Sequence, residues 1–208
     1  VCRKAAREVV EFGREKIAAD AANIEKFLGI PKYPPEEKSY NEIGVATGLA
    51  WTEVGGTILA IEVLAYPGKG EIQLTGKLGA VMQESAKAAL SYVKSIARSL
   101  GIPDSAFKSK NFHIHLPEGA VPKDGPSAGI ALATALVSQL TQRPVAANLA
   151  MTGEITLRGR VLEIGGLKEK VIAAHRSGLK VVLFPQANKK DLDDIPKEVR
   201  EALTLVPV

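Results

Sequence analysis

The sequence predicts an α+β fold with a mixed sheet, preceded by a short helical segment. Three observations support this prediction. Segments typical of strands and of helices follow one another without strict β-α-β alternation, which favours a mixed sheet. Hydrophobic residues make up 46% of the 208 residues, which is enough to form a buried core. A proline-rich, charged stretch at 31–38 separates the first residues from the rest, so we place a boundary near residue 40.

The stretches that predict helices carry apolar residues at helical spacing, and several end at a glycine. The second helix stops at Gly29, and the longest ends before Gly101, where glycine is favoured just after a helix. In chain order the expected helices are 1–17, 21–28, 78–100, 128–140, 166–177 and 196–203.

The stretches that predict strands share alternating or continuous Val, Ile, Leu and Thr. The first two are joined at Gly55-Gly56, and a later pair turns at Arg158-Gly159. In chain order the expected strands are 44–51, 57–65, 71–75, 111–116, 150–157, 160–164, 180–184 and 204–206.

Composition limits the class of protein. The net charge is +4 and the pI about 9.1, but the basic residues are spread out and only 5% of residues are aromatic. Nucleic-acid binding is therefore possible, but no feature of the sequence supports it. The longest near-apolar run, 128–140, is too short to cross a bilayer, so no membrane partner is expected.

The cysteine content predicts the compartment of the protein, and the N-terminal residues indicate a longer chain. The single cysteine, Cys2, excludes an internal disulfide and suits a reducing compartment, so we expect a cytoplasmic protein. The chain begins inside a charged helical pattern, with neither a signal peptide nor an initiating methionine. We therefore expect it to be part of a longer protein.

The stretch 122–129, Pro-Lys-Asp-Gly-Pro-Ser-Ala-Gly, is the most informative part of the sequence. Its serine, Ser127, is surrounded by small residues and directly precedes an apolar helix. Such a position suits a nucleophile, because unpaired N–H groups at a helix N-terminus can stabilise an oxyanion. The alternative is an ordinary turn in which the serine caps the helix.

A serine nucleophile requires a base, and histidine is the usual one. His113 and His115 are two residues apart on a predicted strand, so they share one face. A Ser–His–Asp arrangement with Asp124 is conceivable, as is a polar strand face that happens to carry two imidazoles. A metal site would need a third ligand, and the distant Glu62 is a poor one, so no metal is predicted.

A buried lysine is the other possible base, because burial lowers its pKa until the neutral amine can accept a proton. The predicted helix 166–177 offers Lys168 and Lys170, and both flank its apolar stripe. Helical geometry alone does not choose between them. The alternative is that both lysines are solvated at the surface.

Three motifs in order, 122–129, 151–159 and 165–170, together resemble the proteolytic domain of the Lon family of ATP-dependent proteases. The resemblance runs from about residue 44 to the C-terminus. The Asp-Gly-Pro-Ser form is similar to the soluble A-type branch of that family. Val121 is a departure, since threonine is common there. Two further stretches that match are 47–52 and 113–119.

The resemblance implies a Lon-type domain organisation. Residues 1–40 resemble the end of the helical subdomain that closes the ATPase module, followed by a linker. Residues 41–208 would then be a Ser–Lys proteolytic domain.

The resemblance also implies roles for individual residues. Ser127 is the expected nucleophile and Lys170 the expected general base, with Thr152 orienting the lysine. Asp124 matches a position associated with regulation of the active-site conformation. Supporting roles near the site are expected for Glu62, His113 and His115.

The expected activity is that of a serine endopeptidase which degrades unfolded, damaged or regulatory proteins through an acyl-enzyme. A homo-hexamer that uses ATP and Mg²⁺ is implied for the longer protein. This chain has no Gly-x-x-x-x-Gly-Lys-Ser/Thr motif, so no cofactor is expected here. The competing hypotheses are a non-catalytic, ring-forming or adaptor-binding module, and DNA binding.

Overall fold

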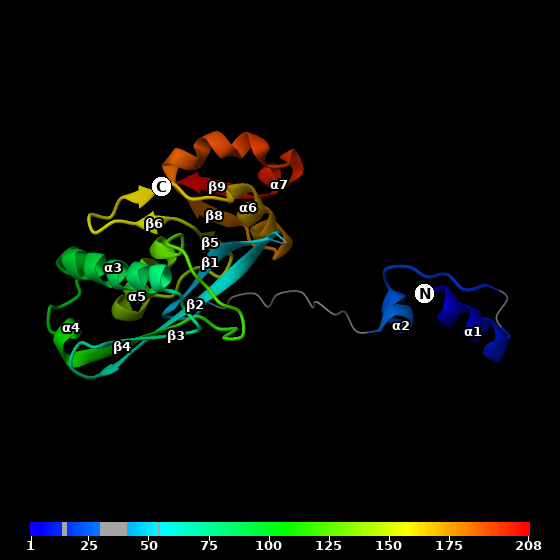
Figure 1. Cartoon of the computed structure of the whole chain (residues 1–208), viewed down its shortest axis with the longest axis horizontal. Helices are drawn as coiled ribbons and strands as arrows, with labels where there is room; N and C mark the ends of the chain where they lie inside the picture. The colour runs from blue at the N-terminus through cyan, green and yellow to red at the C-terminus, as the bar shows by residue number, and fades with distance from the viewer. Residues whose placement is uncertain (14–15, 30–40, 54) are drawn as a thin grey trace. The chain divides into compact units, whose positions relative to one another are not determined.

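The computed structural model describes residues 1–13, 16–29, 41–53 and 55–208 (Figure 1). The chain divides into two compact units, Val1–Glu36 and Glu37–Val208. The predicted linker at 31–38 and the predicted boundary near residue 40 lie outside the described residues.

The first unit contains two helices, α1 (Cys2–Phe12) and α2 (Ile24–Leu28). The predicted helix 1–17 was too long. Gly13 adopts the left-handed conformation, with φ 62°, and ends α1 five residues earlier than the apolar pattern suggested.

The second unit contains strands and helices in a mixed order. Its elements, in chain order, are β1 (Val45–Thr52), β2 (Gly55–Pro67), β3 (Ile72–Thr75), α3 (Ala80–Ile96), η1 (Ala97–Leu100), α4 (Ala106–Ser109), β4 (Lys110–His115), α5 (Gly129–Thr141), β5 (Leu149–Met151), β6 (Glu154–Ile155), β7 (Val161–Leu162), α6 (Leu167–Arg176), β8 (Val181–Phe184), η2 (Gln186–Asp194), α7 (Lys197–Ala202) and β9 (Thr204–Pro207).

Seven of these strands form one mixed sheet, in the order β3-β4-β2-β1-β5-β8-β9. The pairs β1/β2 and β2/β4 are antiparallel, and the other four neighbouring pairs are parallel. The predicted α+β class with a mixed sheet is confirmed.

Helices cover both faces of this sheet (Figure 1). On one face α5 packs against β1, where a Cβ added to Gly48 would lie 3.7 Å from the Cβ of Ala131. On the other face α6 packs against β2, where a Cβ added to Gly56 would lie only 2.1 Å from the carbonyl oxygen of Glu169. Glycine is therefore required at Gly56 for this close approach. Two hydrophobic cores result, one on each face.

The predicted strand 150–157 is broken in two. Its first part is β5 in the large sheet, and its second part, β6, pairs with β7 in a separate two-stranded sheet. The break falls at Thr152 and Gly153. The short helices α4 and η2 were not predicted, because neither carries a long apolar period.

Candidate active site

Ser127 lies directly before α5, at the entrance to the helix. The residue in the N-cap position is Ala128, and no side chain caps the helix. The interpretation of Ser127 as a capping serine was therefore wrong. Its backbone carbonyl accepts hydrogen bonds from Gly153 N (2.7 Å) and Thr152 Oγ1 (3.3 Å), which fixes the residue in place.

The backbone around Ser127 leaves donors available. Among the described residues, the N–H groups of Ser127 and Ala128 have no hydrogen-bond acceptor. Both precede the first turn of α5, where the helix dipole favours negative charge. An oxyanion formed at Ser127 would therefore find unpaired donors beside it.

Lys170 projects from α6 and is only 2% exposed, whereas Lys168 on the same helix is exposed. The Lys170 Nζ donates a hydrogen bond to Thr152 Oγ1 over 3.2 Å. No carboxylate among the described residues pairs with the amine. Burial consequently lowers the pKa of Lys170 from 10.5 to about 8.

The short strand β5 explains how groups from opposite faces of the sheet come together. β5 ends at Met151, and the chain continues through Thr152 and Gly153. Just beyond this strand end, Lys170 from α6 and the residue before α5 both reach Thr152. Thr152 contacts both sides there, since it accepts from Lys170 Nζ and donates to the Ser127 carbonyl.

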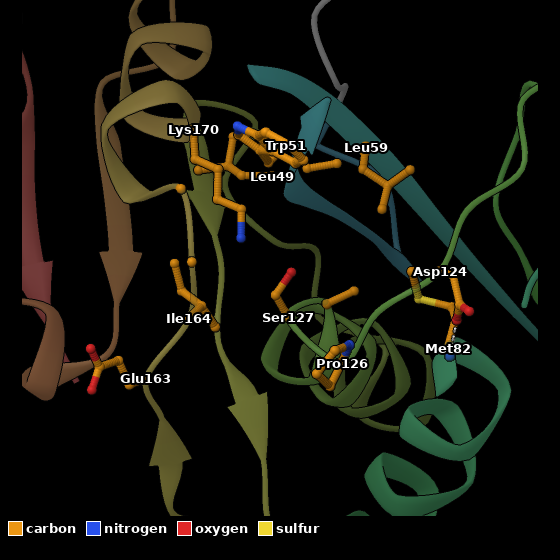
Figure 2. A pocket seen from close by; sticks show the side chains of 14 residues that line it. Leu49, Trp51, Leu59, Met82, Asp124, Pro126, Ser127, Glu163, Ile164 and Lys170 are labelled. Atoms are coloured by element: carbon orange, nitrogen blue, oxygen red, sulfur yellow. Dashed lines mark hydrogen bonds between the residues drawn. The ribbon is translucent and has the colours of Figure 1, made fainter. Parts of the chain in front are cut away.

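Ser127 and Lys170 line one cleft of about 500 Å³. Figure 2 shows the Ser127 hydroxyl and the Lys170 amine pointing toward one another across it. The rest of the lining is mainly apolar or backbone and comprises Leu49, Ala50, Trp51, Leu59, Met82, Asp124, Pro126, Ala128, Glu163, Ile164, Gly165 and Gly166.

Asp124 connects the loop before Ser127 to the start of α3. Its Oδ1 accepts hydrogen bonds from Met82 N and Gly125 N, both at 2.9 Å. The carboxylate thus caps α3 from outside, because the N-cap residue Gly79 has no side chain. A Cβ at Gly79 would lie 2.3 Å from the Asp124 Cγ, so glycine makes room for this contact.

The structure does not bring Glu62, His113 and His115 into the cleft. The two imidazoles lie side by side on β4, as predicted, and both contact Thr75 Oγ1, at 2.8 and 2.7 Å. Glu62 lies opposite His115 on β2. It is six residues from Gly56, where α6 packs, or about 20 Å along the strand. The supporting roles of these residues stay predictions.

The histidines therefore do not complete a Ser–His–Asp arrangement, since none of them lines the cleft. In the part of the chain that the structure describes, no group of three or more His, Cys, Asp or Glu is arranged to hold a metal ion.

Sequence reasoning missed most of the cleft lining. Ile164 was noted only as the end of a predicted strand, Gly166 as part of a motif of interest for its lysines, and Trp51 as part of a matching stretch. Their shared signal is weak, because single apolar residues at strand ends are common.

Comparisons with known proteins show the family of the chain. The family model described as the Lon protease (S16) C-terminal proteolytic domain matches residues 18–208. "Lon protease 1" of Myxococcus xanthus is 56% identical over 209 residues, covering 100% of this chain and 26% of the relative.

Two further relatives have the same relation to the chain. "Lon protease 1" of Syntrophobacter fumaroxidans is 58% identical and covers 98% of this chain and 25% of its own length. "Lon protease" of Heliobacterium modesticaldum is 54% identical, and the match covers 100% of this chain and 26% of the relative. The chain thus spans about a quarter of the length of the curated relatives it matches. It belongs to the Lon protease (S16) family and corresponds to the C-terminal proteolytic domain of that family.

Proposed function

We propose that this chain is a serine endopeptidase in which Ser127 is the nucleophile and Lys170 the general base. The observation that carries the proposal is the buried Lys170 amine, with its lowered pKa of about 8, facing the Ser127 hydroxyl across one cleft. A lysine at its ordinary pKa would be almost wholly protonated at neutral pH and unable to act as a base.

In the first step, neutral Lys170 takes the proton of the Ser127 hydroxyl, and the Oγ attacks the carbonyl carbon of the scissile peptide bond. The carbonyl oxygen becomes an oxyanion beside the N–H groups of Ser127 and Ala128. The Lys170 ammonium then gives its proton to the leaving amine, and the C–N bond breaks. An acyl-enzyme on Ser127 remains.

In the second step, Lys170 takes a proton from a water molecule, which attacks the acyl carbon. Collapse of the intermediate breaks the bond to Ser127 Oγ, and the proton returns to that oxygen. Thr152 keeps the amine aimed at the serine, because its hydroxyl accepts from Lys170 and donates to the Ser127 carbonyl.

The edge of β1 offers a binding surface for an extended peptide. β5 pairs with β1 only at Thr47 and Gly48, whereas β1 continues to Thr52. The residues just beyond this pairing, Leu49 to Trp51, line the cleft. A substrate strand that pairs with this edge would pass alongside Ser127, in the manner of β-strand addition. The apolar lining favours apolar substrate side chains.

The activity of the longer protein is part of the same proposal. Its substrates would be unfolded, damaged or regulatory proteins, and it would work as a homo-hexamer in the cytoplasm, using ATP and Mg²⁺ bound outside this chain. Residues 1–40 would be the end of the ATPase helical subdomain and a linker. In the described part of the chain, no helix has the length and hydropathy needed to cross a membrane.

Three substitutions test the dyad with a fluorogenic peptide that carries apolar side chains. Ser127→Ala and Lys170→Ala should each lower kcat by about 10³-fold or more, because each removes a reacting group. Lys168→Ala is the matched control and should cleave normally, since Lys168 is exposed on the same helix. Normal cleavage by Lys170→Ala, measured alongside an active wild type, would refute the assignment.

The cleavage rate should also depend on pH in a defined way. Because only neutral Lys170 accepts the proton, kcat/KM should rise about tenfold between pH 7 and pH 9 and then level off. The Lys168→Ala variant should show the same profile. A rate that is flat over this range, or that rises only above pH 10, would contradict the role given to Lys170.

Burial of this amine should also reduce stability at neutral pH. The pKa of Lys170 is about 8 in the folded state and 10.5 in its ordinary state, so the unfolded chain binds more protons between these values. Above pH 10.5 the buried Lys170 therefore does not lower the free energy of unfolding. As the pH falls from 10.5 to about 8, that free energy decreases.

Lys170→Met should consequently raise the free energy of unfolding at pH 7 by about 1–3 kcal/mol, since methionine fills similar space without a charge. The gain should shrink at pH 9.5. Urea unfolding at both pH values measures it, with the exposed Lys168→Met as the control. A Lys170→Met variant that is less stable than wild type at pH 7 would show that burial of the Lys170 amine does not destabilise the folded protein.

A further inference from the structure

The wall of the cleft opposite Ser127 consists of residues 163–166, which connect β7 to α6. We call this segment the cleft wall. It has no strand or helix structure of its own, and Ile164 within it is 8% exposed. Figure 2 shows Ile164 on the side of the cleft that faces Ser127. Some other part of the protein must therefore hold this backbone in place.

Asn188 supplies that support. It lies in η2 and is completely buried. Its side-chain Oδ1 accepts a hydrogen bond from Ile164 N (3.0 Å), and its Nδ2 donates one to the Ile164 carbonyl oxygen (2.8 Å). One amide side chain thus satisfies both backbone groups of Ile164, as a neighbouring β-strand would. Nδ2 also donates to Asp191 Oδ2 over 2.6 Å, which orients the amide.

The Ile164 side chain also belongs to the hydrophobic core beneath α6, and the two ends of the cleft wall make further contacts. Glu163 forms an ion pair with Lys190 (2.6 Å), but both side chains are about half exposed, and such pairs contribute little. Gly166 lies against Trp51, since a Cβ at Gly166 would be 2.8 Å from the Trp51 Cδ1. Core packing thus holds the Ile164 side chain, Asn188 holds the Ile164 backbone, and Trp51 lies against the Gly166 end.

We infer that Asn188 is a positioning residue, which fixes the cleft wall through Ile164 and thereby sets the affinity of the cleft for its peptide substrate. The inference rests on the proposed function. Lys170 has support that does not involve the cleft wall, because its amine donates to Thr152 Oγ1 and its helix, α6, packs against β2 at Gly56. Loosening the wall should therefore affect substrate binding more than the chemical step.

The variant Asn188→Leu tests this in the 208-residue chain, because leucine has a similar volume and makes neither hydrogen bond to Ile164. With the fluorogenic peptide, KM should rise about three- to tenfold while kcat stays within about twofold of wild type. Val93→Ala is the stability control, since Val93 is buried in α3, in the core on the other face of the sheet. It should lower stability and leave KM unchanged.

A second measurement does not depend on catalysis. Trp51 is the sole tryptophan of the chain, and it contacts the cleft wall at Gly166. In Asn188→Leu its fluorescence should be quenched more readily by acrylamide than in wild type, whereas Val93→Ala should leave the quenching unchanged. Quenching of Trp51 still tests the position of the cleft wall if the wild-type chain cleaves no peptide. Absence of cleavage by the wild type would count against the proposed function and not against the role of Asn188.

Three results would overturn the inference. The first is an Asn188→Leu variant that matches Val93→Ala in both KM and Trp51 quenching. The second is a loss of kcat with KM unchanged, which would show that Asn188 acts on the chemistry. The third is a Lys190→Met variant that raises KM as much as Asn188→Leu, which would assign the support to the ion pair.

Discussion

The hydrogen bond from the Lys170 amine to the Thr152 hydroxyl is the interaction on which the proposed chemistry depends. A buried lysine would ordinarily be paired with a carboxylate, which would keep it protonated. Here, among the described residues, its partner is a neutral hydroxyl, so burial lowers the pKa without an opposing charge. Such a lysine lowers the stability of the fold at neutral pH, but its neutral amine can act as a general base.

The sheet makes this arrangement possible by ending early. Three residues of β5 bring the chain to Thr152 and Gly153, where groups from α6 and from the start of α5 meet. Gly153 and Thr152 both bond the Ser127 carbonyl, and Thr152 also accepts from Lys170, so Thr152 positions both the proposed nucleophile and the proposed base. The rest of the cleft, including the wall held by Asn188, is built around this point.

Much of this fold could be predicted from the sequence, because apolar periodicity and glycines mark most strands and helices. The same signals failed at the site. Periodicity could not separate Lys168 from Lys170, since both flank the apolar stripe. The family resemblance favoured Lys170, and its burial gives the physical difference between the two. In the run 150–157 the sign of the break was Gly153 alone, and the structure adds its hydrogen bond to the Ser127 carbonyl.

Asn188 illustrates the limit most clearly. It lies among lysines and aspartates in a stretch with no apolar period, so the sequence favours a surface position. Its burial arises from long-range pairing with the backbone of Ile164, twenty-four residues away. Side chains that replace a missing strand leave no local pattern, and only the assembled structure identifies them.

The most direct test of the central claim is the pKa of Lys170 itself. NMR can follow the Cε and Nζ resonances of lysine through a pH titration, with the signal assigned by comparison with Lys170→Met. We predict a midpoint near pH 8, well below those of the exposed lysines. A midpoint at 10 or above would show that the amine is protonated at neutral pH, and the role of Lys170 as general base would be untenable.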